Sequence, residues 1–166
     1  MSSRQQVGTP SSRLLRGTLK EMSRANEIES WTFGVADGVP SPVAPYAHAT
    51  AAGSWVYATG QLPIVPETGL LAGETISEQT HQVLLNLKKV LDQVGSGIDR
   101  CVMIRAYLTS MDDYAEFNTA YATWFPLRLP SRTCIGVTGL ALGAKVEIDA
   151  VALLGQDDAA NNNPPH

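Results

Sequence analysis

The stretch SRTCIGVTGLALGAKVEIDAVALL, residues 131–154, contains two strand-like runs separated by a turn with two glycines. The first run contains Arg132 and Cys134, and the second contains Glu147. Because side chains alternate between the faces of a strand, Arg132 and Cys134 share one face. If the two runs form a hairpin of the right parity, Cys134 lies roughly opposite Glu147. Arg132 and Glu147 would then border one pocket.

A fixed cation and a carboxylate in one pocket suit a small anionic substrate. The guanidinium of Arg132 can hold a substrate carboxylate through two hydrogen bonds, and the carboxylate of Glu147 can exchange a proton with a water molecule. The alternative is an exposed cross-strand ion pair, which is common and contributes little to stability. Spacing alone favours this alternative.

Length and composition limit the kind of protein. A chain of 166 residues is long enough for one domain with a core. Only 17% of the residues are charged, which suggests that some surface is buried against copies of the chain. The net charge of −4 disfavours generic nucleic-acid binding, and no apolar run is long enough to span a membrane. Cys101 and Cys134 lack metal or redox spacing and are interpreted as reduced thiols.

The two ends differ from the rest of the chain. Residues 1–40 are interpreted as an arm outside a core domain at 41–155, and the polar tail 156–166 is predicted to be disordered. The arm has four basic residues before its first acidic one: Arg4, Arg13, Arg16 and Lys20. Such a segment also resembles a mitochondrial transit peptide. We favour an arm that packs on the body or on a neighbouring subunit, in a cytoplasmic protein.

Periodicity predicts an α+β fold. Thr75 and Glu78 form a capping-box pattern, followed by apolar residues at helical spacing as far as Gly95. A second helix is predicted from 110–112 to Pro126. The predicted strands are 54–58, 101–108, 132–137 and 145–154. These elements fit one sheet with two helices on one face, and the other face is apolar enough to need a symmetric partner.

Several other residues are candidates for the pocket, each with a plainer alternative. Gly60 can let the backbone approach a ligand while Thr59 offers a hydroxyl, or the two form a bulge. Tyr46 can offer its phenol or belong to an interface, and Asn118 can reach a ligand or face water. Cys134 has no histidine placed to activate it, so a packed thiol is favoured over a nucleophile.

The order and spacing of five segments resemble the reactive intermediate deaminase family (RidA, also called YjgF). The segments are Ala44-Pro45-Tyr46, Thr59-Gly60-Gln61-Leu62-Pro63, Asp113-Tyr114-Ala115-Glu116-Phe117-Asn118, Pro130-Ser131-Arg132-Thr133-Cys134 and Lys145-Val146-Glu147-Ile148. The resemblance extends over about residues 45–154. It implies a chorismate-mutase-like fold, assembled as a homotrimer with a central barrel and with pockets at the subunit interfaces.

The resemblance also implies a reaction that needs no cofactor and no metal. It is the hydrolysis of 2-imino acids, or of enamine tautomers such as 2-aminoacrylate, to 2-keto acids and ammonia. Arg132 would hold the carboxylate, Glu147 would orient or deprotonate the attacking water, and the backbone of Cys134 would contact the nitrogen end. The remaining wall would consist of Tyr46 from a neighbouring chain, Thr59, Gly60 and Asn118.

Departures from the family pattern concern the substrate. The family usually has a serine at the position of Thr59, an acidic residue at that of Gly136 and a different turn at 138–141. A larger enamine, such as an aminomuconate, is therefore an alternative substrate. A trimer that only binds small carboxylates, or that has a regulatory, chaperone-like or ribonuclease role, is an alternative function. An acid near the bound anion would weaken mere binding, which favours catalysis.

Overall fold

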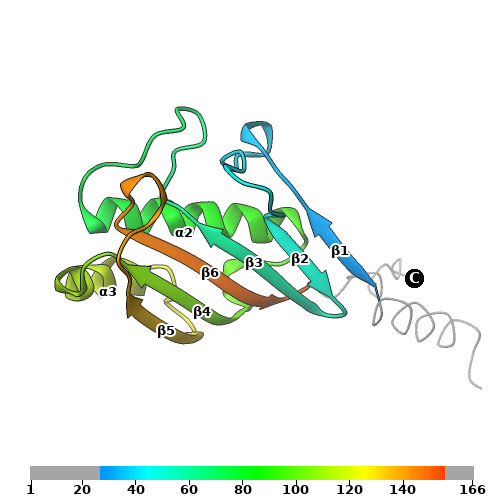
Figure 1. Cartoon of the computed structure of the whole chain (residues 1–166). Coiled ribbons are helices and arrows are strands. Elements are labelled where there is room, and N and C mark those ends of the chain that lie inside the picture. Colours follow the sequence, from blue (N-terminus) through cyan, green and yellow to red (C-terminus); the bar gives the residue numbers. More distant parts are fainter. Residues whose placement is uncertain (1–26, 156–166) are drawn as a thin grey trace, which may run out of the picture.

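The computed structural model describes residues 27–155, which form a six-stranded mixed sheet with two helices on one face (Figure 1). The strands are β1 (Ile28–Trp31), β2 (Ala49–Ala52), β3 (Trp55–Gln61), β4 (Cys101–Leu108), β5 (Ser131–Gly136) and β6 (Val146–Leu153). Their order in the sheet is β1-β2-β3-β6-β4-β5. The helices are α2 (Ile76–Gln93) and α3 (Tyr114–Ala122). The predicted α+β class is confirmed.

The sheet extends into the segment that we expected to form an arm outside the core domain. β1 lies within residues 1–40 and pairs antiparallel with β2, from Ile28 opposite Ala52 to Trp31 opposite Ala49. Both strands are four residues long, too short for a clear alternation in the sequence. The rest of the expected arm and the tail 156–166 lie outside the described residues.

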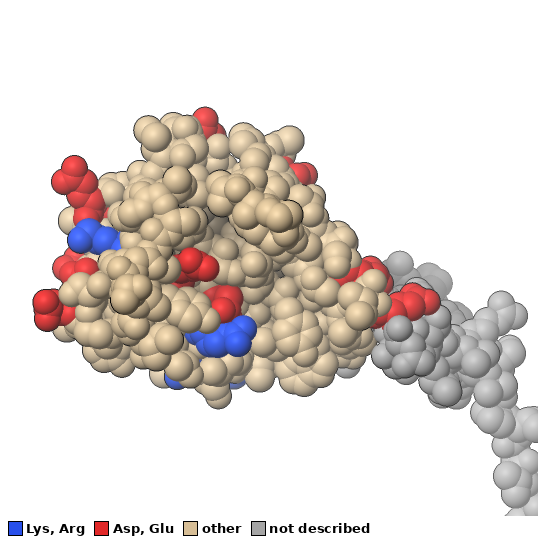
Figure 2. Space-filling view, viewed as in Figure 1, with Lys and Arg blue, Asp and Glu red and all other residues tan. Residues whose placement is uncertain are grey.

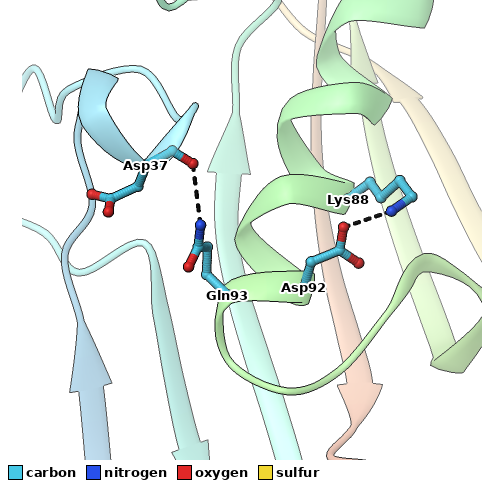
Figure 3. Close-up of polar contacts among 4 residues, drawn as sticks. All are labelled: Asp37, Lys88, Asp92 and Gln93. Carbon is cyan, nitrogen blue, oxygen red and sulfur yellow. Dashed lines mark hydrogen bonds and ion pairs between the residues drawn. The ribbon is translucent and has the colours of Figure 1, made fainter.

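Helix α2 begins at the predicted capping box. The amide of Glu78 donates to Thr75 Oγ1 at 3.2 Å, and the amide of Thr75 donates to the Glu78 carboxylate at 3.0 Å. At the other end of the helix, Gln93 Nε2 donates to the carbonyl oxygen of Asp37 at 3.2 Å (Figure 3). The helix is therefore anchored at both ends, and its apolar side is fully buried against the sheet.

Helix α3 is shorter than the sequence predicts, because its α-helical part ends at Ala122, four residues before Pro126. Phe117 and Tyr121 are buried, whereas Tyr114 is 38% exposed. The rings of Phe117 and Tyr121 have centroids 5.6 Å apart, and those of Tyr121 and Phe125 are 4.7 Å apart. This aromatic row lies beside β5.

The expected hairpin of residues 131–154 is wrong. β5 pairs in parallel with β4, while β6 pairs antiparallel with the other side of β4. The chain leaves β4, crosses over through α3 and returns as β5, which is the connection that two parallel neighbours require. Cys134 consequently lies beside Ala106 of β4, and Glu147 lies beside Tyr107 of the same strand.

The two faces of the sheet have different environments. Ile104 and Ile148 point toward the helices and are fully buried. On the opposite, open face the aromatic residues Trp55 and Tyr57 are 42% and 49% exposed. Figure 2 looks onto this open face, where acidic and basic side chains meet near the middle of the sheet. Within residues 27–155, no helix is both long enough and apolar enough to cross a membrane.

Candidate functional site

Arg132 lies on the helix side of β5, at the edge of the sheet. Its Nη2 atom donates to Asn118 Oδ1 at 2.7 Å, with a longer contact of 3.4 Å to the hydroxyl of Tyr114. The guanidinium carbon is 4.5 Å from the ring centroid of Tyr121. These contacts hold one edge of a half-buried guanidinium. No carboxylate among the described residues forms an ion pair with it, so its Nε and Nη1 donors are open to an anion.

Cys134 follows Arg132 on the same face of β5. It is half-buried, and burial raises the pKa of its thiol above the ordinary range, so the sulfur stays protonated near neutral pH. A protonated thiol is a poor nucleophile, in line with the packed thiol that the sequence favours. β5 is an edge strand of the described sheet, so one side of its backbone has no neighbouring strand. Contact with a ligand through the backbone of Cys134 is compatible with this position.

Glu147 lies on the open face, beside an irregularity in β3. Ala58 pairs with Ala150 and Gln61 pairs with Ile148, so Thr59 and Gly60 together oppose the single residue Asp149. This is a β-bulge, as one of the two interpretations predicted. The bulge also brings Gly60 against Glu147: a Cβ atom at position 60 would collide with the carboxylate. The glycine therefore makes room for the carboxylate of Glu147.

The environment of Glu147 favours its protonated form. Burial raises the pKa of its half-buried carboxyl, and the negative charge of Asp149 raises it further. A carboxyl whose pKa is moved toward neutrality can both accept and return a proton near physiological pH. Glu147 is therefore suited to handling the protons of a water molecule.

Tyr46 belongs to the same side of the molecule as Gly60. Both line a pocket, open to solvent, with about 270 Å³ of empty space, together with Pro40, Ser41, His48, Gln61, Leu62 and Ile64. The ring of Tyr46 packs edge-on against His48, with centroids 5.7 Å apart. The sequence placed Tyr46 in the site but did not predict this neighbour.

His48 fixes the segment around Tyr46. It is 2% exposed, its Nδ1 accepts the amide hydrogen of Phe33 at 3.1 Å, and its Nε2 lies 3.0 Å from the carbonyl oxygen of Pro40. These partners require a neutral ring with its hydrogen on Nε2. Burial lowers the pKa of His48, which also favours the neutral ring. In the sequence only its position two residues after Tyr46 hinted at this role.

A second group that sequence reasoning missed lies next to Glu147. Arg105 Nε donates to Asp149 Oδ1 at 2.7 Å, and the hydroxyl of Tyr107 donates to Asp149 Oδ2 at 2.9 Å. Alternation along 101–108 predicts that Arg105 and Tyr107 share the wetter face of their strand. Their common partner could not be identified without the strand order.

The predicted site residues thus form two groups on opposite faces of the sheet. The helix-side group contains Arg132, Asn118 and Cys134, and we call it the arginine half-site. The open-face group contains Glu147 with Thr59 and Gly60, and Tyr46 is connected to it through the pocket that it lines with Gly60. We call these four residues the glutamate half-site. β4 separates β5 from β6, so one copy of the chain does not bring Arg132 and Glu147 to one ligand.

Comparison with known proteins gives the same family as the motifs. A family model described as endoribonuclease L-PSP matches residues 37–154. The chain belongs to this family, the RidA/YjgF family. Among curated RidA/YjgF relatives, Protein HMF1 of Saccharomyces cerevisiae is 34% identical over 125 residues, covering 75% of this chain and 96% of HMF1. Protein MMF1, mitochondrial, of the same yeast is 36% identical over 114 residues, covering 69% of this chain and 78% of MMF1.

Solved structures of the family have the same fold. The structure of Escherichia coli TdcF with bound serine superposes on this chain with a TM-score of 0.71 and 25% sequence identity. The match covers 76% of this chain and 100% of the TdcF chain. The match therefore leaves out part of this chain and none of the TdcF chain.

Proposed function

We propose that this protein hydrolyses reactive 2-imino acids, or enamine tautomers of the 2-aminoacrylate type, to 2-keto acids and ammonia. An iminium carbon is already electrophilic, so the protein has to orient the substrate, position a water molecule and transfer protons. Arg132 offers a guanidinium without a carboxylate partner in the described chain, and this single observation carries the proposal. Such a guanidinium suits the carboxylate of an imino acid.

The second group that the reaction needs is a carboxyl able to exchange protons with water. Glu147 has the burial and the raised pKa for that role. The neighbour TdcF has been solved with serine, a small 2-amino acid with the same carboxylate. That observation supports a small carboxylate as the ligand class of this chain as well.

We further propose that each complete site is assembled from two copies of the chain in a homotrimer. The arginine half-site lies on the edge strand β5, where a neighbouring copy can approach it. The glutamate half-site lies on the open face, whose exposed aromatic rings favour a partner. An interface that brings β5 of one copy to the open face of the next would unite Arg132 with Glu147.

The reaction can be tested with an amino-acid oxidase that generates imino acids in situ, while release of ammonia and keto acid is followed. We expect the protein to accelerate release above the spontaneous rate, and Arg132→Ala and Glu147→Gln each to abolish the acceleration. Lys88→Gln, which alters an exposed pair on α2, is the control and should retain full activity. Lack of acceleration across small, branched and aromatic amino acids would favour a binding protein instead.

The two-copy site predicts complementation between inactive variants. When Arg132→Ala and Glu147→Gln chains are co-expressed and purified as mixed assemblies, some interfaces combine an intact Arg132 with an intact Glu147. In a cyclic trimer that contains both variants, about one third of the sites would be intact. Recovery of activity near that fraction supports the two-copy site, whereas an inactive mixture of confirmed composition would show that one copy contains the whole site.

For the cellular location we propose the cytoplasm, with the mitochondrion as the alternative. The alternative rests on the basic residues near the N-terminus and on the mitochondrial relative MMF1. Imaging the full-length chain with a C-terminal fluorescent tag, beside a version lacking residues 1–26, distinguishes the two locations.

A further inference from the structure

The open face contains a polar network that the proposed reaction does not use directly. Asp149 is its centre: one carboxylate oxygen accepts a hydrogen bond from Arg105 and the other accepts one from Tyr107. The Asp149 side chain is only 13% exposed, whereas that of Arg105 is 50% exposed. A nearly buried carboxylate therefore has both oxygens satisfied by two side chains of β4.

The network lies immediately beside the glutamate half-site. Asp149 is two residues after Glu147 on β6, so both side chains are on the open face. Tyr107 lies directly across from Glu147, and Arg105 lies across from Asp149. The bulge residues Thr59 and Gly60 complete the surroundings on the β3 side. A change in the charge of Asp149 consequently shifts the pKa of the Glu147 carboxyl.

We infer that Arg105 and Tyr107 are positioning residues that act on Glu147 through Asp149, and that they set the lower pH limit at which the site works. The inference rests on the proposed function, because it assigns Glu147 the task of handling water. Arg105 partly neutralises Asp149, and this limits the repulsion that Asp149 exerts on an ionised Glu147. The Tyr107 hydroxyl points its hydrogen at the same carboxylate, and this dipole partly offsets the negative charge of Asp149 at Glu147.

Among residues 27–155, few other titratable or charged groups lie on this face near Glu147. The titratable and charged side chains near Glu147 are Lys145 and Asp149 next to or on β6, Arg105 and Tyr107 on β4, and Tyr46 of the same half-site. Tyr57 on β3 shares the face but lies farther along the strand, opposite Val151. Of these, Asp149 is the acidic neighbour that raises the pKa of Glu147. Asp149 also accepts the hydrogen bonds that Arg105 and Tyr107 of β4 donate.

The inference predicts opposite effects for two substitutions. Asp149→Asn removes the negative neighbour, so the ionised form of Glu147 is favoured and the acidic limb of kcat/KM moves to lower pH. Arg105→Gln leaves Asp149 without its cation, so the limb moves to higher pH. Each shift should be on the order of one pH unit. Tyr107→Phe should move the limb upward by less, and Arg105→Lys, which keeps a cation, should leave it near the wild-type position.

The experiment measures pH profiles of imine hydrolysis and, in parallel, the titration of the Glu147 carboxyl by ¹³C NMR on the same variants. Lys88→Gln and Asp92→Asn break an exposed pair on α2 and serve as matched controls without a shift (Figure 3). Opposite shifts for Asp149→Asn and Arg105→Gln support the inference. Unchanged limbs and titrations, or shifts in the same direction, would overturn it, even if activity falls.

The two proposals fail in different ways. If the wild-type protein does not accelerate imine hydrolysis, the proposed reaction fails, and the NMR titration alone decides whether the network acts on Glu147. If the wild type is active but the Glu147 titration is the same in all variants, the inference fails and the reaction stands. If Asp149→Asn does not fold, the comparison of Arg105→Gln with Arg105→Lys tests the inference instead, because only Arg105→Gln should shift the Glu147 titration to higher pH.

Discussion

At the scale of single residues, Gly60 determines where the carboxylate of Glu147 can lie. A methyl group at this position would meet the far end of the Glu147 side chain rather than the backbone. We expect Gly60→Ala to fold normally but to displace the carboxylate, lowering kcat/KM by about 10²-fold. Gly139→Ala, at a glycine with open space around it, is the control. Measured activity and thermal unfolding of both variants test this, and an active Gly60→Ala would contradict it.

Asn118 has a role that can be separated from direct substrate contact. Its carboxamide oxygen holds Nη2 of Arg132 at 2.7 Å. Asn118→Asp would place a carboxylate on the guanidinium and compete with the substrate, so KM should rise by roughly tenfold or more while kcat falls less. Asn118→Ala should raise KM less, because the guanidinium is loosened but not occupied. Steady-state kinetics on both variants would contradict this order if Asn118→Ala had the larger effect on KM.

At the scale of elements, the cap of α2 is a stability feature separate from the site. Thr75→Ala removes the oxygen that accepts the Glu78 amide hydrogen, and loss of such a cap costs about 1 kcal/mol. We expect urea unfolding to give a free energy lower by about that amount, with kcat/KM at 25 °C unchanged. Thr119→Ala, at an exposed position inside α3, should change stability less. A large loss of activity in Thr75→Ala would contradict the separation.

The sequence predicts individual elements better than their arrangement. α2 has a cap, an apolar period and a terminal glycine, which are local signals. β5 and β6 were identified as strands, yet their pairing depends on α3, which carries the chain across from β4 so that β5 lies parallel to it. The order strand, helix, strand along 101–136 was the available signal for that crossover. The same limit applies to Arg105, Tyr107 and Asp149, which meet only because β4 lies beside β6.

At the scale of the whole molecule, the open face of the sheet is expected to be the contact between copies. Tyr57 is 49% exposed on this face, whereas Leu85 is 40% exposed on α2. We expect Tyr57→Glu to yield smaller assemblies with little activity, because a charge would be buried at the interface. Leu85→Glu should keep both the assembly and the activity. Light scattering after size-exclusion chromatography checks this, and an intact trimer of Tyr57→Glu would contradict it.

The bulge in β3 also restricts how this strand can change over generations. Because Thr59 and Gly60 share one opposing residue, Gln61 turns inward and is only 4% exposed. Deletion of one of the two would restore a regular ladder with Gln61 still opposite Ile148, but it would remove the bulge that brings Gly60 against Glu147. Substitution at position 59 leaves the orientation of its neighbours intact. Descendants of this chain can therefore vary the identity of that residue more freely than the length of the strand.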